Sequence, residues 1–146
     1  MLALIQRVSQ ARVEVDGEAI GAIGPGLLAL VGVEPGDGDA QVRRMADRLL
    51  GYRVFADAAG RMNRSLADCG GDLLLVSQFT LAADTSSGMR PGFSTAAMPD
   101  EAEPLFARLV HTCVQRHAGR VETGRFGAHM AVSLTNDGPV TFLLKA

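Results

Sequence analysis

The chain has 146 residues, of which 47% are hydrophobic and 21% are charged, and its formal net charge at pH 7 is -2. This length suits one domain with its own core, and the mild acidity argues against a large nucleic-acid footprint. No apolar run is as long as a membrane span, the N-terminus lacks a signal-peptide pattern, and the two cysteines have no CxxC spacing. We therefore expect a single cytoplasmic domain, residues 1–146, without a disulfide or a membrane segment.

The beginning of the chain predicts a β-meander. Residues 2–15 are rich in β-forming side chains, and Asp16-Gly17 is typical of a hairpin turn. The continuous apolar run 27–33 does not alternate with polar residues. That pattern indicates a strand buried on both faces, near the centre of a sheet.

An amphipathic helix is expected next. Asp39 is a suitable N-cap, and the helix should run to about residue 52 because apolar residues recur at the spacing of one helix face. Those residues are Val42, Met45, Ala46, Leu49 and Leu50. Residues 52–55 predict a short strand, and residues 63–71 predict irregular chain.

A second helix is expected near Asp100. Asp100 and Glu103 have the spacing of a capping box, and Pro104 is tolerated only in the first turn of a helix. The segment before it, 82–92, contains few apolar side chains and predicts a surface loop.

Two strands, 129–135 and 140–144, are expected to close the chain with a tight connection between them. The whole pattern gives about seven strands and two main helices, with most strands joined by hairpins. We therefore predict an α+β fold with a mainly antiparallel, barrel-like curved sheet rather than a parallel doubly wound sheet.

The stretch 72–81 is the centre of this pattern, because a buried apolar strand here ends in polar groups. Its end carries the side chains of Ser77, Gln78, Phe79 and Thr80. Polar groups at the end of a buried strand are typical of a site. The alternative is that these side chains only satisfy backbone groups where the chain leaves the sheet.

Arginines gather in the middle of the chain. Three of them share the polar side of the first predicted helix, and others follow in strands and loops: Arg43, Arg44, Arg48, Arg53, Arg61, Arg64 and Arg90. They form either a basic stripe that meets phosphate or an ordinary solvated face.

The common catalytic signatures are absent. The chain has no P-loop, GxSxG or HExxH motif and no clustered metal-ligand spacing, so we expect neither a metal nor a cofactor. Its histidines are read as surface or hydrogen-bonded residues, and Cys113 as a small core residue. Ser77 or Thr80 would need an adjacent base to be a nucleophile, and none is assignable, so these hydroxyls are expected to position a substrate.

Five motifs together resemble the bacterial D-aminoacyl-tRNA deacylase family. They are Leu4-Ile5-Gln6-Arg7-Val8, Ser77-Gln78-Phe79-Thr80, Gly88-Met89-Arg90-Pro91, Thr123-Gly124-Arg125-Phe126 and Asn136-Asp137-Gly138-Pro139-Val140-Thr141. The resemblance runs from end to end, and the pair SQFT and NDGPVT at this separation is its most specific part.

The resemblance implies a cytoplasmic homodimer with its active sites at the subunit interface. Such an enzyme binds aminoacyl-tRNA, hydrolyses the ester between a D-amino acid and the terminal adenosine, rejects L-aminoacyl-tRNA and removes glycine from mischarged tRNA. By position, Ser77, Gln78, Phe79 and Thr80 line the pocket. Gly138 and Pro139 read chirality across the interface and are held by Arg7, with Met130 as a pocket neighbour.

Chiral rejection of this kind can be explained by exclusion. A cis Gly138-Pro139 bond, a form adopted by about 5–6% of X-Pro bonds, would aim backbone carbonyls at the ammonium group and Cα of the substrate. That leaves room only for hydrogen, so an L side chain clashes and a D side chain points to solvent. The residues alone favour a plain trans turn, and the cis form follows from the resemblance.

The expected mechanism uses the substrate's own RNA. Because no protein base is assignable, the free hydroxyl beside the ester on the terminal ribose assists water, while donors near residues 77–80 stabilise the oxyanion. Two rival interpretations are a module that binds aminoacyl-tRNA without hydrolysis and a structural dimer in which the SQFT end is only a strand terminus. A hydrolase of free D-amino-acid esters is a further alternative.

Overall fold

The computed structural model describes all residues from 1 to 146. Its elements, in chain order, are β1 (Leu2–Val15), β2 (Glu18–Ile23), β3 (Gly26–Gly32), α1 (Asp39–Gly51), β4 (Phe55–Ala56), β5 (Met62–Arg64), α2 (Leu66–Cys69), β6 (Asp72–Ser77), the 3₁₀ turn η1 (Phe79–Ala82), α3 (Pro99–Arg116), β7 (Val121–Thr123) and β8 (Ala131–Lys145).

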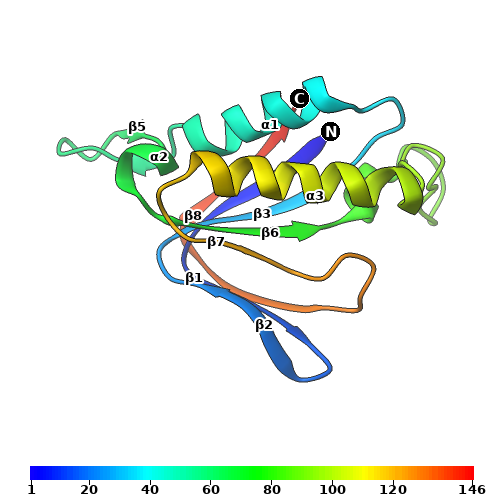
Figure 1. Cartoon of the computed structure of the whole chain (residues 1–146), viewed down its shortest axis with the longest axis horizontal. Helices are drawn as coiled ribbons and strands as arrows, with labels where there is room; N and C mark the ends of the chain where they lie inside the picture. Colours follow the sequence, from blue (N-terminus) through cyan, green and yellow to red (C-terminus); the bar gives the residue numbers. More distant parts are fainter.

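A six-stranded curved sheet organises the fold (Figure 1). The strand order is β2-β1-β3-β6-β7, and β8 pairs with the long strand β1. The pairs of β1 with β2, β3 and β8 are antiparallel, whereas β3–β6 and β6–β7 are parallel. Parallel pairs need long crossovers, and the segments containing α1 and α3 supply them. The predicted α+β fold with a curved, barrel-like sheet is confirmed.

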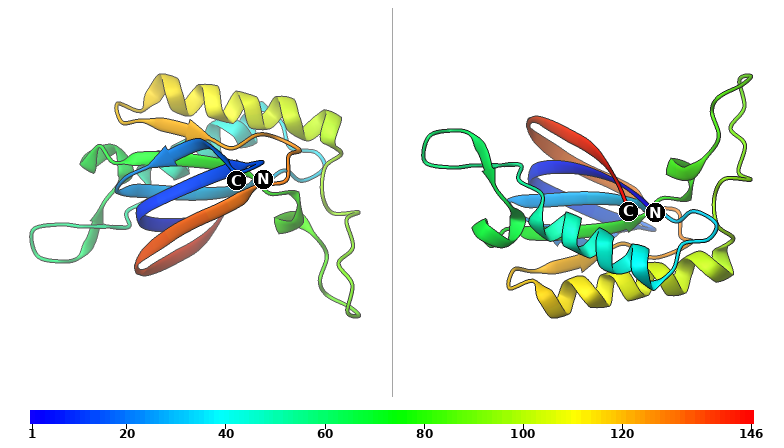
Figure 2. Two further views of the ribbon diagram at one scale, coloured as in Figure 1. Left: turned by 90° about the horizontal axis from the view of Figure 1, so that it is seen from below. Right: turned by 90° about the horizontal axis from the view of Figure 1, so that it is seen from above.

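Helices α1 and α3 lie side by side over one face of the sheet (Figures 1 and 2). A cluster of 23 buried residues fills the space between these helices and the sheet. All five residues predicted to form the apolar face of the first helix are buried in it. A second cluster of seven buried residues lies against the opposite face, and it includes Val13, Leu28 and Val76. No helix has the length and hydropathy needed to cross a membrane.

The helix boundaries correct two predictions. The first helix is capped by Gly38 rather than Asp39, because the side chain of Gln41 accepts the Gly38 N–H at 3.0 Å. The second main helix begins at Pro99, with Met98 as an N-cap that makes no side-chain hydrogen bond. Proline suits the first helical position, so no capping box at Asp100 is used. Pro104 consequently lies inside the helix, beyond its first turn.

The region between α1 and β6 also differs from its prediction. The expected strand 52–55 is reduced to Phe55–Ala56, and the segment 63–71 contains the end of β5 and the short helix α2. Ser65 caps α2 by accepting the Asp68 N–H, while Asp68 accepts the Ser65 N–H at 2.8 Å. This Ser-x-x-Asp pair was a readable helix signal.

The last two predicted strands are one strand. β8 runs from Ala131 to Lys145 and pairs with β1 on both sides of residues 137–140, which have no partner there. The register shifts on β1 between Gln6 and Val8 and again between Val8 and Gln10. The segment around Gly138 is therefore an irregularity within a strand and does not reverse the chain.

The two cysteines are expected to differ in reactivity. Cys113 is fully buried on α3, and burial raises the pKa of its thiol to about 12. Cys69 is only partly buried. Because the thiolate is the reactive form, Cys69 should react with a coloured disulfide reagent at pH 8, and Cys113 should react only after denaturation. Rapid reaction of both thiols in the folded protein would contradict this assignment.

Candidate functional site

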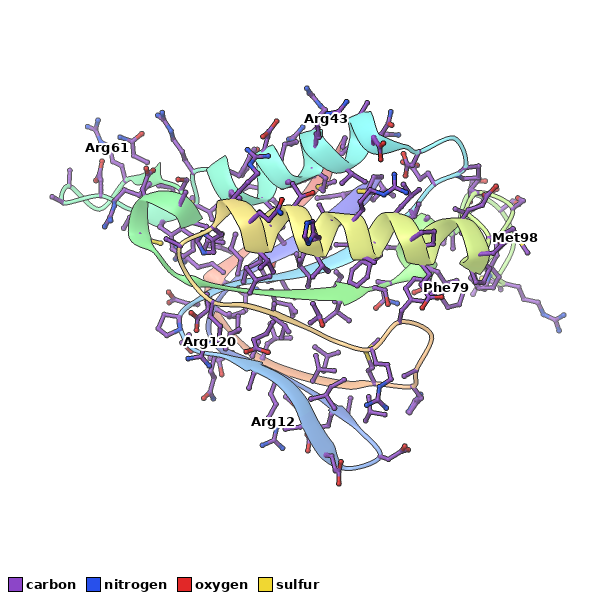
Figure 3. The ribbon with its side chains drawn as sticks, in the orientation of Figure 1. Arg12, Arg43, Arg61, Phe79, Met98 and Arg120 are labelled. Atoms are coloured by element: carbon purple, nitrogen blue, oxygen red, sulfur yellow. The ribbon has the colours of Figure 1, made fainter.

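The Ser-Gln-Phe-Thr motif lies where β6 leaves the sheet. Leu73 to Val76 are buried between β3 and β7, and Ser77 is the last residue of the strand. The Gln78 N–H donates to the Val31 carbonyl at 2.7 Å, and η1 then turns the chain. Exposure rises along the motif, so Ser77 and Gln78 are half-buried while Phe79 and Thr80 are exposed. Figure 3 shows Phe79 at this end of the molecule.

The hydroxyl of Thr80 is held by the neighbouring amide. Gln78 Nε2 donates to Thr80 Oγ1 at 2.5 Å. An amide N–H cannot remove a proton, so this contact orients the hydroxyl without activating it. The backbone N–H groups of Phe79 and Thr80 begin a helical turn, where such donors have no intrahelical acceptor. They are suited to binding a developing negative charge.

The exposed ring of Phe79 packs against a second aromatic ring, that of Phe93. The rings of Phe79 and Phe93 are tilted against each other with centroids 5.3 Å apart, and their residues are 59% and 46% exposed. Thr95 Oγ1 donates to the Ala82 carbonyl at 2.6 Å and holds this part of the chain against η1. Sequence reasoning missed Phe93, because a lone aromatic after a polar loop carries no signal of its partner.

The predicted site residues fall into two groups. Residues 77–80, at the end of β6, are the first group, and Gly138 and Pro139, in the middle of β8, are the second. Their peptide bond is cis, as the resemblance implied, and both residues are exposed. Arg7 Nε donates to the Asp137 carbonyl at 2.9 Å and lies 3.4 Å from the Asp137 carboxylate. The other end of the same guanidinium donates to the Val54 carbonyl at 2.7 Å. Arg7 therefore joins this segment to the start of the β4–β5 hairpin.

The residues flanking the Gly-Pro pair brace it. Asn136 Oδ1 accepts the Val140 N–H at 2.8 Å, and Asn136 Nδ2 donates to Thr141 Oγ1 at 2.8 Å. These bonds connect the two sides of the irregular segment. Asn136, Val140 and Thr141 of the NDGPVT motif thus hold the backbone of the Gly138-Pro139 segment in its conformation.

Met130 lies near the end of β6, on the side of the Ser77–Thr80 group. A Cβ built on Gly124 would lie 2.6 Å from Met130 Sδ and 3.6 Å from Val76 Cγ1. Met130 therefore lies near the residue that precedes Ser77, and it packs against the smaller of the two buried clusters. Gly124 leaves space for this side chain.

One chain does not bring the two groups together. Arg7 lies opposite Leu27, which lies opposite Leu73, so Ser77 is four residues, or about 13 Å, further along β6. β8 is also three strands away from β6, which adds about 14 Å across the sheet.

Two surface hollows of about 340 and 490 Å³ are lined by neither group. No group of three or more His, Cys, Asp and Glu side chains is arranged to hold a metal ion.

The fold and the positions of the motifs define an α+β protein of a known structural class. A solved chain described as "c-Myc DNA Unwinding Element Binding Protein" has the same fold, with a TM-score of 0.95, 36% identity, and coverage of 100% of this chain and 99% of that one. The family model described as "D-Tyr-tRNA(Tyr) deacylase" matches residues 4–145, and the chain belongs to this family.

Two relatives illustrate how close the match is. A D-aminoacyl-tRNA deacylase from Stenotrophomonas maltophilia (strain K279a) is 76% identical over 145 residues, covering 99% of both chains. The D-aminoacyl-tRNA deacylase from Xanthomonas axonopodis pv. citri (strain 306) is 74% identical over 145 residues, again with 99% coverage of both.

Proposed function

We propose that the protein is a D-aminoacyl-tRNA deacylase that proofreads the chirality of charged tRNA in the cytoplasm. It hydrolyses the ester between a D-amino acid and the terminal adenosine, releases the amino acid and tRNA, and leaves L-aminoacyl-tRNA intact. It also removes glycine from mischarged tRNA. The observation that carries this proposal is the end-to-end match to curated deacylases at 74% and 76% identity.

The active unit is proposed to be a homodimer. The separation of Ser77 from Gly138 within one chain supports this, because a pocket that uses both needs two copies. The strand β8 supports it too, since it pairs only with β1 and exposes Leu134, Phe142 and Leu143. A long unpaired edge with exposed apolar side chains is the kind of surface that a second chain covers.

In this dimer the Gly138-Pro139 segment of one chain enters the pocket of the other. Gly138 has no side chain, is exposed, and lies on a segment fixed by Arg7 and Asn136. A rigid backbone close to the substrate Cα excludes a side chain on one side and tolerates one on the other. The same geometry admits glycine, which has no side chain.

Substrate-assisted hydrolysis is the proposed chemistry. The free ribose hydroxyl beside the ester orients a water molecule, whose oxygen attacks the ester carbonyl carbon. The N–H groups of Phe79 and Thr80 stabilise the tetrahedral oxyanion. The carbon–oxygen bond to the ribose then breaks, the departing ribose oxygen takes the proton that the attacking water loses, and the free amino acid leaves. Gln78 and Thr80 position the acyl group, and Phe79 supports the adenosine.

The proposal is tested by measuring amino-acid release from matched D- and L-aminoacyl-tRNA. Wild type should release the D form at least about 100-fold faster than the L form. Gln78→Ala should lower D release by about tenfold or more, because the hydrogen bond that orients Thr80 is lost.

The rival interpretations give different results in the same assay. A binding module would hold charged tRNA without releasing amino acid. A purely structural motif would leave release unchanged in Gln78→Ala, and a general D-ester hydrolase would cleave free D-amino-acid esters as fast as the tRNA-linked ones. Equal release of D and L forms would contradict the exclusion argument at Gly138.

A further inference from the structure

The β4–β5 hairpin stands away from the body of the fold (Figures 1 and 2). Its turn is well bonded, since the Asp57 carboxylate accepts the N–H groups of Ala59 and Arg61 at 2.9 and 3.0 Å. The Asp57 N–H also donates to the Arg61 carbonyl at 2.8 Å. The hairpin is therefore an ordered arm, although it contributes little to the core.

This arm carries a local positive charge. Arg53, Arg61 and Arg64 are all exposed, and Asp57 is the single acidic residue between positions 53 and 64. Arg53 donates to Asn63 Oδ1 at 3.2 Å and Arg64 to the Asp68 carbonyl at 2.9 Å, so two of these side chains are held in place. The guanidinium of Arg61, near the tip (Figure 3), makes no hydrogen bond or ion pair. The chain as a whole has a net charge of -2, so this basic arm contrasts with the rest of the surface.

The arm is tied to the Gly-Pro segment. Arg7 donates from one nitrogen to the Val54 carbonyl at 2.7 Å and from another to the Asp137 carbonyl at 2.9 Å. Val54 is buried at the start of the hairpin, and Asp137 precedes Gly138. A single guanidinium therefore fixes the position of the arginine arm relative to Gly138.

We propose that the arginines of this hairpin bind backbone phosphates of the tRNA whose aminoacyl end lies in the partner subunit's pocket. The proposal rests on the proposed function, in which Gly138 enters that pocket. In that dimer, Arg7 places the arm beside the same pocket, because it bonds to both Val54 and Asp137. Exposed guanidinium groups form paired hydrogen bonds with phosphate. Contacts to phosphate carry no base specificity, which suits an enzyme that acts on many tRNAs.

The test compares two double variants with the same loss of charge. Arg61→Ala/Arg64→Ala removes two of the three positive charges of the arm. Arg43→Ala/Arg44→Ala removes two exposed positive charges from α1, and Figure 3 shows Arg43 away from the arm. The arm variant should raise KM for D-aminoacyl-tRNA about tenfold and lower the slope of log KM against log salt by about one to two. It should leave hydrolysis of a D-aminoacyl ester of adenosine unchanged. The α1 variant should change neither, and Arg61→Lys/Arg64→Lys should recover most of the loss.

Mixed dimers test the cross-subunit part. An Arg61→Ala/Arg64→Ala chain paired with a Gln78→Ala chain has one unaltered pocket, and the hairpin beside that pocket is the intact one of its partner. The KM for tRNA at this pocket should therefore equal the wild-type value. A KM that stays raised would place the arm in the pocket of its own chain and overturn the proposal.

Other results would also overturn it. An unchanged KM for tRNA in the arm variant would contradict the phosphate contact. An equal loss of hydrolysis rate on the adenosine ester would mean that the hairpin only supports the pocket. Affinity for uncharged tRNA, measured by fluorescence anisotropy, gives a readout without turnover. If wild type released no amino acid from either substrate, the proposed function would fail, while a tenfold weaker affinity of the arm variant would still support the phosphate contact.

Discussion

Gly138→Ala is expected to lower kcat/KM on D-aminoacyl-tRNA by about 100-fold while the chain still folds. Gly138 has φ +142°, and a Cβ there would lie 2.6 Å from Val140 Cγ2 and 3.2 Å from Arg7 Nη2. Relief of these contacts must move the segment that, in the proposed dimer, borders the substrate Cα. A misplacement of about 1 Å in a reacting geometry can cost about 100-fold in rate.

Gly17→Ala is the matched control for this variant. Gly17 has φ +80° in the turn between β1 and β2, and a Cβ there meets nothing within 4 Å. It should cost about 1 kcal/mol of stability through backbone strain and leave release of the D form unchanged. Stability is measured by chemical denaturation, and rates with both D and L substrates. Full activity and selectivity in Gly138→Ala would mean that this backbone does not border the substrate.

A D-aminoacyl-tRNA ending in 2′-deoxyadenosine, acylated on its 3′ oxygen, is expected to react at least about 100-fold more slowly than the ribose form. The reason is that the removed hydroxyl is the group proposed to orient water, and a positioned group of this kind typically contributes about 10²- to 10⁴-fold. Thr80→Ala should lose only about tenfold on the ribose substrate, because the Thr80 hydroxyl accepts a hydrogen bond from Gln78 and has no base beside it.

Single-turnover rates with both substrates and both proteins separate these roles. Binding of the deoxy substrate, measured alongside, shows whether the loss is in chemistry or in affinity. The opposite pattern, in which Thr80→Ala abolishes release with binding intact and the deoxy substrate still reacts, would favour a threonine nucleophile over the RNA-assisted mechanism.

The elements that sequence predicted well are those with strong periodicity. The apolar face of α1 and the buried runs of β3 and β6 follow from spacing alone. Helix starts were less predictable. The first helix is capped by Gly38, whose N–H donates to the side chain of Gln41, and the second starts with Pro99, so neither uses the expected carboxylate cap. The continuity of β8 through Gly138 could not be read either, since Asp-Gly-Pro is typical of a reversing turn. The pairing with β1 on both sides of this segment is what continues the strand.

The site was predictable as motifs but not as an arrangement. Spacing along the chain identified Ser77 to Thr80 and Gly138-Pro139, yet it carried no information on their distance in space. That distance depends on which strands pair and in which register. The contact of Phe79 with Phe93 and the bonds from Arg7 to Val54 and Asp137 join distant segments, and no local pattern announces such contacts.

The distance between the two groups has a genetic consequence. In the proposed dimer, each active site is built from two copies of the gene product, so a lesion at Gly138 disables the site of the neighbouring chain and spares its own. Two defects carried by the same chain, at Gly138 and Gln78, would therefore silence both sites of a dimer with a normal partner. The same two defects on opposite chains would leave one site whole, so partly defective alleles should complement each other.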